Sequence, residues 1–290
     1  MKEQFPLDFT LTLACNNNCV FCPRKELLPI VIEPERAPAA IRKAGGCSNA
    51  VLTGGEPTTL PDLAGIAGAC KAAGAQKITL TTNGRTISVP AYLDKLVSSG
   101  INYYTISLYS HLPEVHDRLT RVKGSCAQTW KGLSNAMRLK RAGKIEVGVN
   151  TVLCAENIRT ADKTLRMMKL LGVDTVLLIN PSGPAEKHIF SYSLVKPLLR
   201  KLKERPSAYP ARVIFRGFPL CLFPEGVPAE NQDIEGAGGV SGANLSRYSQ
   251  NFRTQFTKPP ALCRGCRSSS RCNGIYTPYL KKYSVKGLGK

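Results

Sequence analysis

Short apolar or β-branched runs alternate with amphipathic stretches along the first part of the chain. The runs have the length of strands, and the stretches between them repeat apolar residues at helical spacing. Several helical stretches end at a glycine, the residue favoured just after a helix C-terminus. Strands that alternate with such helices predict βαβ units and a parallel sheet. The expected strands are 7–13, 50–53, 77–81, 103–108, 145–153 and 175–179, and the expected helices are 37–43, 62–73, 90–98, 127–142 and 157–171.

Three cysteines follow the first expected strand in the run CNNNCVFC. The spacing C-x3-C-x2-C places the thiolates of Cys15, Cys19 and Cys22 on one short loop. Thiolates are soft ligands that suit an iron–sulfur cluster, and a [4Fe–4S] cube with three cysteines keeps one iron open to a small molecule. The alternative is a zinc site, although zinc usually takes cysteines as close pairs with a second pair further on.

This loop resembles that of the radical S-adenosylmethionine (SAM) superfamily, with Phe21 as the aromatic residue before the last cysteine. The resemblance implies a partial (β/α)6 TIM barrel of the α/β class, with the chemistry at the carboxyl ends of the strands. It also implies that SAM chelates the open iron. One electron then cleaves SAM to methionine and a 5′-deoxyadenosyl radical, which removes a hydrogen atom from the substrate.

A second stretch, GGEP, follows the second expected strand and comprises Gly54, Gly55, Glu56 and Pro57. The two glycines allow a ligand to approach the backbone closely, and the proline fixes the exit of the turn. The resemblance implies that this stretch binds the amino group of SAM, with backbone oxygen and the Glu56 carboxylate as acceptors. Taken alone, GGEP could be just a tight strand–helix turn, but its place after one strand–helix unit and downstream of CNNNCVFC supports the resemblance.

Polar residues at the ends of later strands give weaker signals. The resemblance implies that Thr81, Ser107 and Asn150 contact SAM, and the alternative is ordinary hydrogen bonding at strand ends. The run HDRLTRVKGS at 116–125 resembles a stretch common in radical SAM enzymes with C-terminal cluster domains. Arg121 stands there at a position where glycine is usual.

A second cysteine group lies near the C-terminus and comprises Cys221, Cys263, Cys266 and Cys272. Four thiolates can fully ligate a second [4Fe–4S] cluster. The arrangement resembles the twitch domain, a shortened relative of the SPASM domain with one auxiliary cluster, and the alternative is a structural zinc site. We therefore expect a radical SAM barrel at 1–215 and a small cysteine-rich cluster region at 216–290.

The composition of the 290 residues, 43% of them hydrophobic, suits a buried core. The absence of a signal-peptide pattern and of a long apolar run predicts a cytoplasmic protein without a membrane span. Seven of the eleven cysteines fall into the two groups, which favours metal binding over disulfides. The net charge of +20 would suit RNA, but the basic residues are spread along the chain, so nucleic acid is not the favoured partner. A polar, glycine-rich stretch at 224–251 predicts a surface loop.

Three functions are compatible with the sequence. The favoured one is a radical SAM maturase that abstracts hydrogen from a peptide or protein side chain, with a reductase such as ferredoxin or flavodoxin as the electron donor. The alternative is a radical SAM enzyme of cofactor or small-molecule biosynthesis. A remote third is a basic RNA-binding protein with structural zinc. The last residues, KKYSVKGLGK, lack the Gly-Gly of the GTP cyclase of molybdopterin synthesis, and this predicts a different family.

Overall fold

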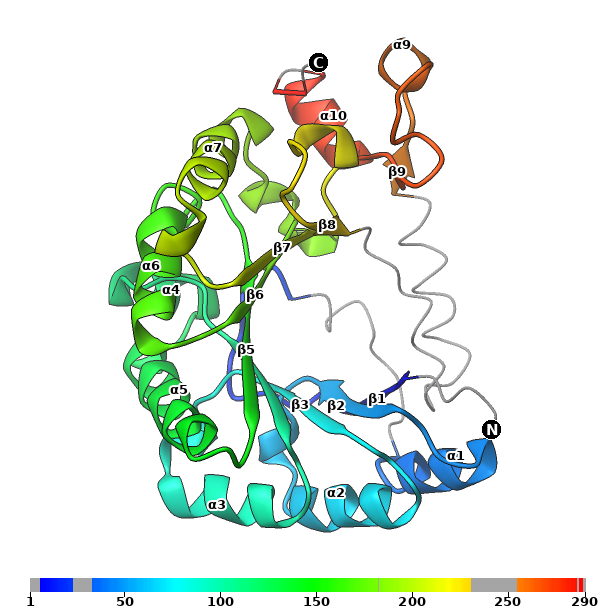
Figure 1. The fold of residues 1–290 in the computed structure, drawn as a ribbon, viewed down its shortest axis with the longest axis vertical. Helices are drawn as coiled ribbons and strands as arrows, with labels where there is room; N and C mark the ends of the chain where they lie inside the picture. The colour runs from blue at the N-terminus through cyan, green and yellow to red at the C-terminus, as the bar shows by residue number, and fades with distance from the viewer. Residues whose placement is uncertain (1–5, 23–32, 182, 231–254, 286, 289–290) are drawn as a thin grey trace.

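The computed structural model describes residues 6–22, 33–181, 183–230, 255–285 and 287–288. Its main body is an eight-stranded sheet in which each strand is parallel to the next along the chain (Figure 1). The strands are β1 (Pro6–Thr12), β2 (Asn49–Gly54), β3 (Ile78–Thr82), β4 (Tyr103–Ser107), β5 (Glu146–Val152), β6 (Thr175–Ile179), β7 (Arg212–Arg216) and β8 (Ala229–Glu230). The predicted α/β fold with a partial barrel is therefore confirmed.

The sheet has two strands more than the six that the sequence predicts. β7, with the sequence RVIFR, carries arginine at both ends around three buried residues, so its apolar run is too short to stand out. β8 is only two residues long and pairs with β7 beyond the predicted domain boundary at residue 215. The boundary remains a prediction, but the sheet itself continues past it.

Helices connect successive strands and cover the outer face of the sheet (Figure 1). Four begin within two residues of the predicted starts, whereas α6 begins four residues late. The Asn157 side chain accepts a hydrogen bond from the Cys154 N–H at 2.7 Å, which forms a turn ahead of that helix. The main helices are α1 (Arg36–Ala44), α2 (Leu63–Ala72), α3 (Pro90–Ser98), α4 (Pro113–Thr120), α5 (Ser125–Arg141), α6 (Ala161–Leu171) and α7 (Lys196–Glu204).

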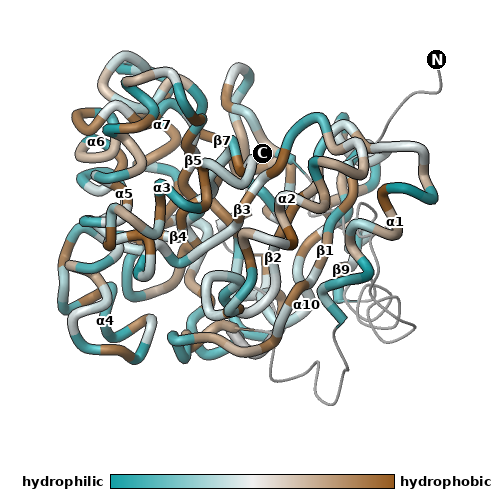
Figure 2. The backbone as a smooth tube through the Cα atoms, turned by 90° about the horizontal axis from the view of Figure 1, so that it is seen from below, coloured by the Kyte–Doolittle hydropathy of each residue, from teal (hydrophilic) through white to brown (hydrophobic). Residues whose placement is uncertain are grey.

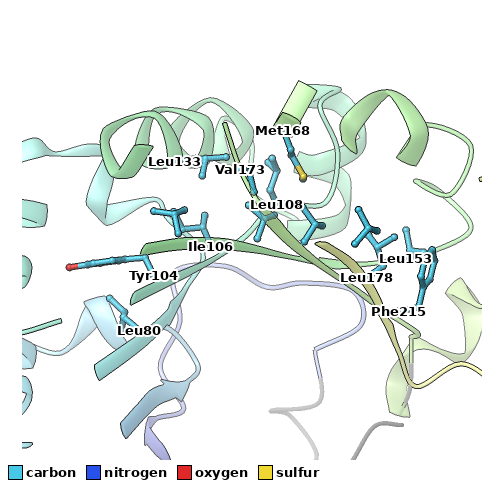
Figure 3. Packing of buried hydrophobic residues seen from close by; sticks show 14 of the residues in the cluster. Leu80, Tyr104, Ile106, Leu108, Leu133, Leu153, Met168, Val173, Leu178 and Phe215 are labelled. Carbon is cyan, nitrogen blue, oxygen red and sulfur yellow. The ribbon is translucent and has the colours of Figure 1, made fainter. Parts of the chain in front are cut away.

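The core lies between the sheet and this helical layer. Ile106 of β4 and Leu178 of β6 are buried and lie in one layer with Leu133 of α5 and Met168 of α6 (Figure 3). Hydropathy along the backbone follows the same division, with apolar segments in the strands and alternating polar and apolar positions in the helices (Figure 2). Burial of these side chains stabilises the barrel and fixes the positions of the strand ends.

The C-terminal part packs on the barrel through α10 (Thr277–Tyr283). Tyr279 stacks on Tyr192, with ring centroids 3.8 Å apart and an interplanar angle of 6°. The remaining elements there are the antiparallel strands β9 (Phe256–Thr257) and β10 (Ile275–Tyr276) and the short helix α9 (Pro260–Cys263). Most of the predicted surface loop at 224–251 lies outside the described residues. Within the described part of the chain, no helix has the length and hydropathy of a membrane span.

Candidate functional site

A cavity of about 260 Å³ opens at the carboxyl ends of strands β2 to β6. The thiols of Cys15, Cys19 and Cys22 line it together with strand-end residues from each of those strands. The parallel sheet brings all these ends to one edge, which is where such barrels place their chemistry. The other lining residues are Asn17, Phe21, Gly54, Gly55, Thr81, Thr82, Asn83, Ser107, Tyr109, Val152, Ile179, Asn180 and Pro181.

Backbone hydrogen bonds hold the cysteine loop against the end of α4. The N–H of Asn18 donates to the Thr120 carbonyl at 3.0 Å, and the N–H of Val20 donates to the Leu119 carbonyl at 2.9 Å. On the other side, Arg85 donates from its Nη1 to Asn17 Oδ1 at 2.9 Å and to the carbonyl of Asn16. The loop is therefore fixed from two directions by the chain itself.

The GGEP turn clamps the start of the same loop. The Gly55 N–H donates to the Thr12 carbonyl at 2.6 Å, and the Glu56 N–H donates to the Ala14 carbonyl at 2.8 Å. A Cβ atom on Gly55 would lie 2.2 Å from the Ala14 carbonyl oxygen. Gly54 has φ of 129°, where glycine is favoured. Glycine at both positions thus permits two backbones to meet beside Cys15.

We expect Gly55→Ala to displace the cysteine loop. The added methyl group must move backbone atoms, and such overpacking costs about 1–3 kcal/mol of stability. Iron retention and SAM cleavage should both fall, measured on anaerobically reconstituted protein. The control is Gly68→Ala in α2, whose Cβ would meet nothing nearer than 3.9 Å. Equal behaviour of the two variants would contradict this role of Gly55.

Glu56 does not line the cavity, although the sequence predicts a direct bond to SAM. Its carboxylate is 1% exposed and accepts hydrogen bonds from within the chain. Oε1 accepts from the Thr58 N–H and hydroxyl at 3.1 and 2.7 Å and from the Thr82 hydroxyl at 2.7 Å, and Oε2 accepts from the Asn83 N–H at 2.6 Å. Burial raises the pKa of Glu56, while these donors oppose that shift. We infer that Glu56 positions the turn beside β3.

We therefore expect Glu56→Gln to destabilise the turn. All four partners are donors, so the amide NH₂ of glutamine must face one of them and leave it unpaired. The loss should be about 1–3 kcal/mol in the free energy of unfolding, accompanied by weaker SAM binding. Thermal unfolding and calorimetric titration with SAM measure the two effects, with the exposed Glu35→Gln as control. Weaker SAM binding at unchanged stability would instead support a direct contact between Glu56 and SAM.

Aromatic side chains connect the cysteine loop to the barrel. The Phe21 ring meets Tyr109 edge-on at 4.9 Å, and Tyr109 stacks on His116 at 5.4 Å. The Tyr109 hydroxyl is hydrogen-bonded to the side chains of Ser107 and Cys19. Burial raises the pKa of Tyr109, so the hydroxyl stays protonated. Phe21 thus both lines the cavity and joins the loop to the barrel.

The other predicted contact residues divide into two groups. Thr81 and Ser107 line the cavity, whereas Asn150 and Pro57 do not. Asn150 lies within β5, pairs in register with Ser107, and its backbone carbonyl accepts a sheet hydrogen bond from the Leu108 N–H. Sequence reasoning did not identify Tyr109 or Asn180 as site residues. Asn180 directly follows β6, so the strand-end rule that selected Thr81 would have found it.

Asn180 also links the cavity to the C-terminal part. Its Nδ2 donates to the Tyr192 hydroxyl and to the Gly217 carbonyl, each at 3.0 Å. Tyr192 stacks on Tyr279 of α10, and its N–H donates to the Tyr279 hydroxyl at 3.2 Å. Through Tyr192, these contacts connect α10 to the end of β6.

A second cavity, of about 100 Å³, gathers the four C-terminal cysteines. Cys221, Cys263, Cys266 and Cys272 all line it, although 41 residues separate the first two. Burial, followed by the neighbouring thiols, raises the pKa of Cys221. The N–H of Gly274 donates to the Cys272 sulfur at 3.3 Å. Among the described residues no group of three or more His, Cys, Asp or Glu is arranged to hold a single metal ion.

A family model described as the Radical SAM superfamily matches residues 9–178 of the chain. This match covers more than half of the 290 residues, and the chain belongs to the radical SAM superfamily. The family implies a [4Fe–4S] cluster and SAM. Both fit the first cavity, because three thiols, strand-end hydroxyls and open glycine backbone line one space.

Relatives by sequence carry names from cofactor biosynthesis. A probable GTP 3′,8-cyclase of Sulfurisphaera tokodaii is 30% identical over 206 residues, which cover 69% of this chain and 64% of that protein. An AdoMet-dependent heme synthase of Methanosarcina barkeri is 27% identical over 184 residues, which cover 61% of this chain and 51% of that protein. The chain thus spans between about half and two thirds of these relatives. Its predicted distinction from the GTP cyclase remains a prediction.

Similar solved structures include two peptide complexes. Streptococcus suis SuiB bound to the precursor peptide SuiA has a TM-score of 0.64 at 16% identity, covering 100% of this chain and 76% of that one. Native anSMEcpe with bound AdoMet and the Cp18Cys peptide has a TM-score of 0.65 at 14% identity, covering 97% and 95%. At these identities the likeness shows the fold alone.

Proposed function

We propose that this chain is a radical SAM enzyme of cofactor or small-molecule biosynthesis. The observation that carries the proposal is one cavity, shared by the three-cysteine loop and the ends of five strands. The relatives at 27–30% identity support a small-molecule substrate, because both are named for cofactor synthesis. The peptide or protein maturase, favoured by the sequence, has support only from structures at 14–16% identity. The comparisons thus favour the alternative.

Cys15, Cys19 and Cys22 would hold the first cluster. When bound there, a [4Fe–4S] cluster supplies the electron that cleaves SAM to methionine and a 5′-deoxyadenosyl radical. The hydroxyls of Thr81 and Ser107 and the backbone of Gly54 and Gly55 would orient SAM. Phe21 and Val152 give the cavity an apolar wall beside the loop, which would help to keep water from a radical.

We propose that Cys221, Cys263, Cys266 and Cys272 hold an auxiliary [4Fe–4S] cluster. Their common cavity supports one site for all four thiols, including Cys221, which lies far from the other three in the sequence. Full ligation by four cysteines leaves no iron open, so substrate would bind in the barrel cavity. A zinc site with the same four ligands is the alternative, and metal analysis distinguishes the two.

Substrate identity is the part of the proposal that needs a direct experiment. Purified, anaerobically reconstituted enzyme is incubated with SAM, dithionite and one candidate: GTP, a porphyrin precursor or a cysteine-containing peptide. Formation of 5′-deoxyadenosine and the mass of the candidate are followed together. A small molecule that raises 5′-deoxyadenosine and changes mass supports the proposal. Turnover of the peptide but of no small molecule would instead support the maturase function.

A further inference from the structure

The exposed end of α4 beside the cysteine loop carries a group of basic side chains. Arg118 lies in the last turn of α4, Arg121 follows the helix, and Lys123 lies in the turn before α5. All three are exposed. Among the described residues none of them lies within ion-pairing distance of a carboxylate. We call these three residues the α4 basic patch.

The patch lies directly beside the loop that would hold the first cluster. Leu119 and Thr120, which accept the hydrogen bonds from Val20 and Asn18, are flanked by Arg118 and Arg121. Only one peptide unit therefore separates two of the basic residues from backbone bonded to the loop. A partner protein that binds this patch would therefore lie next to the cysteine loop.

Arg121 occupies a backbone conformation that favours glycine. It has φ of 57° and ψ of 32° and terminates α4 in the left-handed region. A non-glycine residue there costs free energy, because its Cβ crowds the following carbonyl. Only two non-glycine residues in the described chain have positive φ, Arg121 and Ser284. An exposed cation held at this cost indicates a use outside the fold.

The local carboxylates do not neutralise the patch. Asp117 accepts hydrogen bonds from the Gly124 N–H at 2.6 Å, the Ser125 hydroxyl at 2.9 Å and the Cys126 N–H at 2.8 Å. The Asp117 carboxylate is thus hydrogen-bonded to the start of α5. Glu114 lies one helical turn before Arg118, and no ion pair joins these two side chains. The surface beside the loop keeps a net positive charge.

We propose that the α4 basic patch docks an acidic one-electron donor protein of the flavodoxin or ferredoxin class. This rests on the proposed radical SAM function, in which one electron from the reduced cofactor of the donor passes to the cluster and oxidises the donor. Positive charge next to the electron-accepting site attracts an acidic partner and raises the rate of encounter. The patch thus sets where the donor binds and how strongly salt weakens that binding.

The test compares two triple variants of the reconstituted enzyme. The first is Arg118→Gln, Arg121→Gly and Lys123→Gln, in which glycine relieves the left-handed backbone. The control is Arg42→Gln, Lys43→Gln and Arg141→Gln. These three residues are exposed and lie at helix ends that face the amino edge of the sheet. Both variants lose three charges, so only position differs.

Production of 5′-deoxyadenosine is measured against the concentration of reduced flavodoxin, at low and high salt, and with dithionite. The first variant should raise the KM for flavodoxin roughly tenfold at low salt and flatten the salt dependence. Its rate with dithionite should match that of the unchanged enzyme, since dithionite needs no docking surface. The control variant should keep the KM of the unchanged enzyme.

Equal effects of the two variants, or an unchanged KM in the first, would overturn the proposal. Loss of binding to single-stranded RNA with an unchanged KM would assign the patch to nucleic acid and also overturn it. Calorimetric titration with flavodoxin gives the docking affinity without turnover, and the first variant should weaken it while the control does not. Failure of the docking proposal can therefore be distinguished from failure of the proposed function. Absence of 5′-deoxyadenosine with dithionite refutes the proposed function, whereas docking is decided by the titration.

Discussion

Replacing Cys15, Cys19 and Cys22 together by alanine should remove about four irons per chain and all SAM cleavage. Among the described cysteines these three line the cavity, and they come from a loop that the chain fixes on two sides. The auxiliary irons should remain. Iron analysis and chromatography of 5′-deoxyadenosine on anaerobic protein measure both effects.

The control for this variant is Cys126→Ala, a buried cysteine outside both groups. It should keep the iron content and the SAM cleavage of the unchanged enzyme. Continued formation of 5′-deoxyadenosine by the triple variant would show that the loop is not the radical site. Loss of all iron, with an unfolded circular dichroism spectrum, would show that the loop is needed for the fold instead.

Replacing Cys263, Cys266 and Cys272 together by alanine should leave the first cluster and uncoupled SAM cleavage intact but abolish product formation. The barrel cavity is built from strands β2 to β6 and does not include this region. α10 should stay on the barrel through the stack of Tyr279 on Tyr192, which involves no cysteine. The segment around the thiols should lose stability, because metal binding would supply much of it.

The single variant Cys221→Ala sharpens this prediction. With four ligands, its removal should open one iron and change the EPR spectrum of the auxiliary cluster without substrate. An unchanged spectrum and iron content would show that Cys221 is not a ligand. One iron of the auxiliary cluster would then be open to bind the substrate. Zinc in place of iron in the purified protein would contradict the auxiliary cluster altogether.

The sequence predicted most of the barrel because the pattern that forms it is local. Strands such as 103–108 are short apolar runs that follow a helix ending near a glycine, here Gly100, and their parallel order follows from short connections. β7 and β8 were not predicted because the apolar run of β7 is only three residues long between two arginines, and β8 has only two residues, of which Glu230 is exposed. α4 was missed because its sequence, PEVHDRLT, is short and mostly polar.

Site residues were predictable only where spacing or a strand end marked them. Spacing marked the cysteine loop, and the end of β3 marked Thr81. The orientation of Glu56 was not predictable, because its four donors come from Thr58, Thr82 and Asn83 after folding. The convergence of Cys221 with Cys263 likewise depends on tertiary structure.

The central claim is that SAM binds at the loop of Cys15, Cys19 and Cys22. The EPR spectrum of the reduced cluster, recorded with and without SAM in the variant lacking Cys263, Cys266 and Cys272, tests it most directly, because only one cluster then contributes. The account predicts one [4Fe–4S] signal whose g-values shift when SAM is added. A signal that SAM leaves unchanged, in protein that retains its iron, would contradict it.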